Sequence, residues 1–138
     1  YHLNYKGNVE LWETNPGNGY SNHNYKDYNL VNEYLENDSN EHGFIIIPVT
    51  KYEICPIGMY KIVFFASDIE DDNDYHFYRQ NSDGSWSHKT NGTIVTNLDC
   101  FGNVIYNPDD DSCDRGKYNV FISYFAITPL NTFDLETE

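Results

Sequence analysis

The sequence predicts an α+β domain in which one amphipathic helix packs on a mostly antiparallel sheet. One segment, residues 24–36, has helical periodicity, and several short runs rich in β-branched and aromatic residues follow it. One helix followed by a series of antiparallel strands is typical of this fold class. The length of 138 residues fits a single domain, and 13 Tyr and 8 Phe supply enough bulk for a hydrophobic core.

The helix is predicted over residues 24–36, with Asn24 as its N-cap, and residues 37–43 are expected to end it. Acidic residues occupy one side of this segment, and apolar residues occupy the other. The apolar residues that recur at helical spacing are Leu30, Val31, Tyr34 and Leu35.

The strands are predicted at residues 9–12, 44–49, 59–66, 75–80, 85–89, 93–96, 104–106 and 118–127. The run 59–66 is apolar on both faces, so we expect it to lie at the centre of the sheet. Residues 81–84 have the chemistry of a turn, because Gly84 can take a positive φ. They therefore join residues 75–80 and 85–89 in a hairpin.

This hairpin carries the densest polar chemistry in the chain. Alternate side chains of a strand point to opposite faces, so His76, Tyr78 and Gln80 share one face of the first strand. Trp86 and His88 point the same way on the return strand. His76 and His88 are 12 residues apart across the hairpin, so their side chains lie close together if they share a face.

A histidine pair of this kind suits acid–base chemistry. Histidine titrates near neutral pH, and a general base needs a partner that orients its ring. His76, with His88, Asn97 or Asp99 as the orienting group, meets this requirement. The alternative is that both histidines are ordinary strand residues whose ring nitrogens are satisfied by neighbouring Tyr and Asp side chains.

The hairpin and the segments around it resemble known proteins. The pattern Asp74-Tyr-His-Phe-Tyr-Arg-Gln80, Trp86-Ser-His-Lys89 and Val95-Thr-Asn-Leu-Asp99 is similar to a group that includes insoluble matrix proteins of mollusc shell and microbial and viral chains. That likeness covers residues 55–127, with a weaker match at residues 1–4. Within it, the two histidine strands resemble the second half of NlpC-type papain-like cysteine hydrolases.

The resemblance to the hydrolases implies a papain-like fold and activity on peptide or amide bonds. It makes His76 the general base and His88, Asn97 or Asp99 its orienting group. The residues that would then shape the substrate cleft are Arg79, Gln80, Trp86 and Lys89.

The nucleophile of such an enzyme is a cysteine that opens a helix upstream of the base. No cysteine precedes Cys55, which lies in a Cys-Pro turn. The resemblance places that cysteine just before Tyr1, so the chain as written lacks its nucleophile. Because the sequence has neither an initiator Met nor a signal peptide at Tyr1, we expect a processed or truncated portion of a longer chain.

The charge of the chain limits its partners. With 22 acidic and 8 basic residues the net charge is −14, which argues against binding to nucleic acid or to an anionic membrane. No run is long enough to span a bilayer. A peptide-like or protein partner, or a second copy of the chain, remains compatible with this charge.

A non-catalytic function is the second hypothesis: a secreted, acidic structural or binding protein that is calcium-associated and self-assembling. Two sequons, at Asn37 and Asn91, fit a secreted protein, and a disulfide between Cys100 and Cys113 is then expected. Adjacent carboxylates in loops can bind Ca²⁺, although a solvated run of charges is the alternative. The candidate ligands are Asp109, Asp110, Asp111 and Asp114.

Overall fold

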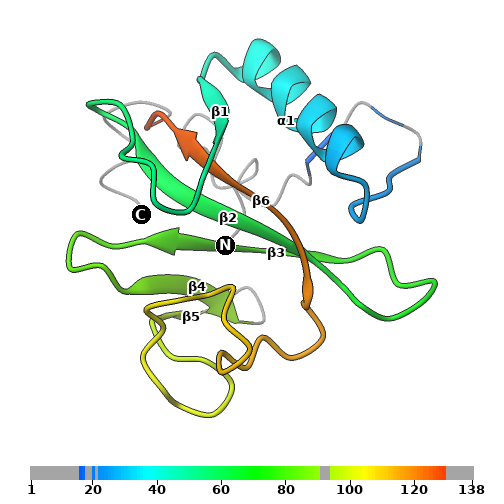
Figure 1. Cartoon of the computed structure of the whole chain (residues 1–138). Coiled ribbons are helices and arrows are strands. Elements are labelled where there is room, and N and C mark those ends of the chain that lie inside the picture. Colours follow the sequence, from blue (N-terminus) through cyan, green and yellow to red (C-terminus); the bar gives the residue numbers. More distant parts are fainter. Residues whose placement is uncertain (1–15, 18–19, 21, 91–93, 130–138) are drawn as a thin grey trace.

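The computed structural model describes residues 16–17, 20, 22–90 and 94–129. Within these residues it shows one helix, α1 (Tyr28–His42), on one face of a six-stranded antiparallel sheet (Figure 1). The strands are β1 (Ile46–Val49), β2 (Tyr60–Ala66), β3 (Tyr75–Gln80), β4 (Trp86–Thr90), β5 (Ile94–Thr96) and β6 (Val120–Ile127). Their order is β1-β6-β2-β3-β4-β5, and every neighbouring pair is antiparallel. The predicted α+β class is confirmed.

The helix differs from the prediction at both ends. It begins at Tyr28, because the carboxylate of Asp27 caps it by accepting the Leu30 N–H at 3.1 Å, whereas Asn24 accepts the Lys26 N–H instead. It continues to His42 because its buried stripe extends one turn further, to Asp38, whose carboxylate accepts the Gly17 N–H at 3.0 Å. The left-handed Gly43, with φ of 75°, ends it.

Strand β2 is central, as predicted, and lies between β6 and β3. It is buried on both faces from its second residue onward. Ile62 and Phe64 pack on the helix side with Val31, Leu35 and other buried residues. Val63 and Phe65 point to the opposite face, so the sheet is the middle layer between two hydrophobic clusters.

The second cluster is covered by connecting segments rather than by another helix. Ile105 packs there with Trp86 and Tyr124, although the predicted strand at 104–106 is wrong: the structure shows only an isolated bridge between Leu98 and Val104. The predicted strand at 9–12 lies outside the described residues.

None of the described helical residues forms a helix long and apolar enough to cross a membrane.

Candidate functional site

The two histidines of the hairpin meet on the face of the sheet opposite α1. Nε2 of His76 on β3 lies 2.8 Å from Nδ1 of His88 on β4, and the two rings are nearly perpendicular. The strand register pairs Gln80 with Trp86, which sets His76 and His88 diagonally across the ladder. The expected convergence of the two side chains is therefore present.

A backbone carbonyl fixes the protonation of this pair. Nε2 of His88 lies 2.8 Å from the carbonyl oxygen of Leu98, and a carbonyl can only accept, so Nε2 carries the proton. Burial lowers the pKa of His88 and favours its neutral form. Nδ1 of His88 then accepts a hydrogen bond from the Nε2–H of His76, and in this tautomer Nδ1 is the unprotonated nitrogen of the His76 ring.

Aromatic rings hold the pair from two sides. The Tyr118 ring stacks on His76, with centroids 4.8 Å apart and planes 16° from parallel. The Tyr78 ring contacts both imidazoles, at 5.1 Å and 4.7 Å between centroids. Such packing restricts the rotation of His76 about its χ angles, which a positioned base requires.

The ring of Tyr118 is itself anchored by charged groups. Its hydroxyl donates to Oδ2 of Asp74 at 2.8 Å, and Nζ of Lys117 lies 3.0 Å from the same oxygen. Burial and the hydrogen bond to Asp74 raise the pKa of Tyr118 to about 12, so the phenol stays protonated at neutral pH. The half-buried network thus runs from Lys117 through Asp74 and Tyr118 to the ring of His76.

The other two predicted orienting residues lie elsewhere. The Asp99 carboxylate accepts backbone N–H groups of Phe101, Asn103 and Asp114 at 2.9, 3.0 and 3.1 Å, and these bonds hold its pKa below the usual range. Asn97 accepts the Ile105 N–H through its backbone. Both residues shape the loop that presents the Leu98 carbonyl. Residue types give no signal for a backbone acceptor, so sequence reasoning missed Leu98.

The four residues predicted to shape a substrate cleft are not brought together. Trp86 is 3% exposed and packs against the Tyr124 ring in the second cluster, so its assignment to an open cleft is wrong. Arg79 lies on the face opposite His76, with its guanidinium 4.4 Å from the Tyr60 ring. Lys89 lies on the sheet face opposite His88, and Gln80 shares the face of His76. Arg79 and Gln80 both line one hollow whose lining includes neither histidine.

The four candidate calcium ligands point in different directions. Asp109 pairs with Lys51 at 2.7 Å, and Asp110 and Asp114 accept nearby backbone N–H groups. Asp111 is exposed. No group of three or more His, Cys, Asp or Glu side chains in the described part of the chain is arranged to hold a metal ion.

The expected disulfide between Cys100 and Cys113 is absent, and both residues are free thiols, as is Cys55. A backbone hydrogen bond joins the two ends of the loop between these cysteines instead: the Cys100 N–H donates to the Asp114 carbonyl at 3.1 Å. Burial raises the pKa of Cys113 to about 11, which disfavours the thiolate needed to form the bond.

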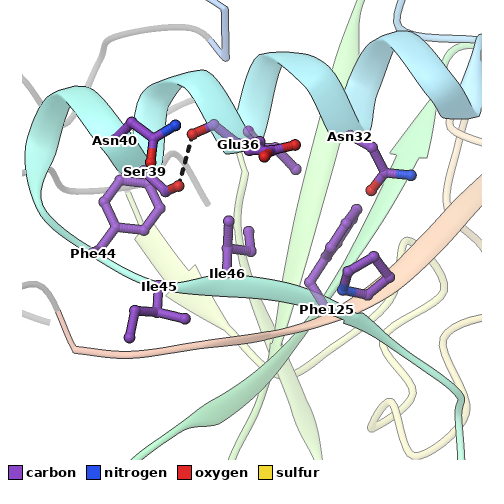
Figure 2. Close-up of a pocket in the computed structure, with 10 residues that line it drawn as sticks. Asn32, Glu36, Ser39, Asn40, Phe44, Ile45, Ile46 and Phe125 are labelled. Carbon is purple, nitrogen blue, oxygen red and sulfur yellow. Dashed lines mark hydrogen bonds between the residues drawn. The ribbon is translucent and has the colours of Figure 1, made fainter.

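A groove of about 350 Å³ lies between α1 and β1, away from the histidines. Figure 2 shows Asn32, Glu36 and Asn40 along the helix, above Ile46 and Phe125 on the strand side. Its lining includes neither histidine, so the groove and the histidine pair are separate features.

Comparison with known proteins finds a partial relative. The chain is 41% identical over 56 residues to insoluble matrix shell protein 1 of Ruditapes philippinarum. That alignment covers 41% of this chain and 36% of the relative, so the chain spans about a third of the length of the protein it matches. No family model and no solved structure matches the chain.

Proposed function

We propose that His76 is the general base of a cysteine-hydrolase-like site that cleaves peptide or amide bonds, with His88 as its orienting residue. The observation that carries this proposal is the chain of hydrogen bonds from the Leu98 carbonyl through His88 to His76, with both contacts at 2.8 Å. A single tautomer satisfies both bonds, and it leaves the basic lone pair on Nδ1 of His76. A helix on one face of an antiparallel sheet is compatible with a papain-like arrangement, which belongs to the same proposal.

The nucleophile in this proposal is a thiol whose proton passes to Nδ1 of His76. Burial raises the pKa values of Cys55, Cys100 and Cys113, whereas an activated thiol needs a lowered pKa. We therefore assign the nucleophile to a cysteine other than these three, supplied from outside this chain.

The test is covalent labelling of the natural protein with a peptide-like vinyl sulfone, followed by mass mapping of the labelled cysteine. We expect label on a cysteine other than the three in this chain. Replacing His76 with Ala should slow labelling by about 10²–10⁴-fold, the usual contribution of a general base. Tyr106→Phe, at an exposed ring outside the site, is the control and should label at the wild-type rate.

Two results would contradict the hydrolase proposal. One is label confined to Cys55, Cys100 or Cys113. The other is a labelling rate that His76→Ala leaves unchanged while circular dichroism shows a folded variant.

A second function, an extracellular acidic structural protein, is favoured by the partial match to a shell matrix protein. The net charge of −14 fits the acidic character of this second function, and it disfavours binding to nucleic acids and anionic membranes. Calcium is not part of this proposal, because the candidate carboxylates do not converge on one point. Antibody staining of the source material should place the protein outside cells, in an insoluble fraction. Recovery in the soluble cell contents would refute it.

A further inference from the structure

Residues 50–59 form the segment that joins β1 to β2 (Figure 1), and this segment carries three large apolar side chains that are highly exposed. Tyr52, Ile54 and Ile57 are 86%, 91% and 105% exposed, respectively. Single exposed apolar residues are ordinary, but three large ones within six residues form a patch of the kind that marks interaction sites.

Hydrogen bonds from a buried cation hold the backbone of residues 50–59 in place. The ammonium of Lys61 on β2, a residue only 7% exposed, donates to the carbonyls of Lys51 and Glu53 at 2.8 and 2.6 Å. The Glu53 carboxylate accepts the Thr50 N–H at 3.1 Å. Because these bonds already order the segment, binding through it costs little further conformational entropy.

A hollow of about 640 Å³ adjoins the same segment. Tyr52 and Ile54 line one side, and Arg79, Gln80 and Asn81 at the end of β3 line the other. An exposed apolar segment beside a hollow on the same surface supplies the two parts that a self-complementary contact needs. In a two-fold arrangement, each copy would place its segment in the hollow of the other.

Charge also favours a second copy at this place. Two chains of net charge −14 repel each other over most of their surfaces. The lining of the hollow includes three cationic side chains, Lys51, Lys61 and Arg79, and one carboxylate, Glu53. Lys51 is paired with Asp109 at 2.7 Å. This part of the surface is therefore less acidic than the chain as a whole, which lowers the repulsion between two copies that meet here.

We propose that residues 50–59 form a two-fold self-association surface, with Tyr52, Ile54 and Ile57 of each copy seated against the hollow of the other. This surface is distinct from the histidine pair. It is independent of whether the protein is a hydrolase or a structural protein.

Sedimentation velocity across a concentration series tests this surface. We expect a monomer–dimer equilibrium with a dissociation constant on the order of 10 μM, as for a small interface. Ile57→Asp should weaken the dimer by about 30-fold or more. The matched control is Phe101→Asp, which adds the same charge at a side chain that is 78% exposed in another loop, and it should change the constant less than about threefold.

The proposal is overturned if the wild-type chain stays monomeric up to about 1 mM or forms open polymers instead of dimers. It is also overturned if the two Asp variants weaken association equally. Circular dichroism of each variant confirms that the substituted chain is folded.

Cross-linking gives a second, independent readout. Cys55 lies within the proposed surface and is half-exposed, whereas Cys100 is exposed in another loop. A short bismaleimide should therefore link two copies through Cys55, and Cys55→Ser should abolish the product while Cys100→Ser preserves it. Linkage that depends on Cys100 would place the interface elsewhere and refute the proposal.

Discussion

Acidification should destabilise the fold through His88 before it protonates the carboxylates. Burial lowers the pKa of His88 in the folded state, and its Nε2–H is committed to the Leu98 carbonyl. An unfolded histidine titrates near pH 6.5, so below that pH the unfolded chain binds more protons at this residue than the folded chain does. The free energy of unfolding therefore falls as the pH falls below about 6.5. Above that pH the contribution of the neutral His88 to stability is fully present.

The size of this effect has a ceiling set by linkage. One group can change the free energy of unfolding by at most about 1.4 kcal/mol per pH unit, so the loss between pH 6.5 and 5.5 is bounded by about 1.4 kcal/mol. The lowered pKa values of Asp74 and Asp99 act in the same direction, but only below about pH 4. Between pH 5.5 and 7.5, the pH dependence of the free energy of unfolding therefore comes from histidines and not from these two carboxylates.

Urea unfolding of wild type and His88→Gln at pH 7.5, 6.5 and 5.5 measures the effect. The Gln amide can still donate to the Leu98 carbonyl but does not titrate, so the histidines outside this pair contribute similarly to both proteins. We expect the stability advantage of wild type over the variant to shrink as the pH falls. An advantage that is constant, or that grows toward acid, would refute the assignment of a neutral His88 in the folded state. Coincident unfolding by Trp fluorescence and circular dichroism checks two-state behaviour.

Three further substitutions test the scaffold, each by urea unfolding. Asp27→Ala removes the N-cap of α1 and should cost about 1 kcal/mol, and no loss would contradict the capping bond. Gly17→Ala places a Cβ 2.7 Å from Cγ of Tyr34 at a φ of +72°. It should cost more than Gly84→Ala, where φ is +89° but no atom lies within 4 Å of the new Cβ, and the reverse order would refute the clash. Asp99→Ala leaves three backbone N–H groups without their carboxylate and should cost about 2–3 kcal/mol. A cost below about 0.5 kcal/mol would show that water replaces the carboxylate.

The features that the sequence predicted correctly are those encoded by local pattern. The two-sided apolar run of β2 and the turn before Trp86 depend on neighbouring residues, and both are present in the structure. The convergence of His76 with His88 followed from the alternation of the two hairpin strands.

The features that the sequence did not predict depend on contacts between distant segments. The helix continues past its predicted end at residue 36, and in this added part Asp38 is buried and accepts a hydrogen bond from Gly17, 21 residues away in the chain. The orienting group of the histidine pair is a main-chain carbonyl, which every residue possesses, so no side-chain type at position 98 could identify it. Trp86 was assigned to a cleft because its chemistry suits one, whereas its burial follows from packing against β6.

The place of β6 in the sheet has a consequence for biosynthesis. Among the described strands, β1 is hydrogen-bonded to β6, whose residues 120–127 lie more than 70 positions after β1 in the chain. Residues 120–127 must therefore leave the ribosome before β1 finds its partner strand, and a pairing between such distant segments predicts slow completion of folding. Until then β2 exposes one unpaired edge to other nascent chains, which makes chaperone capture and aggregation the competing fates.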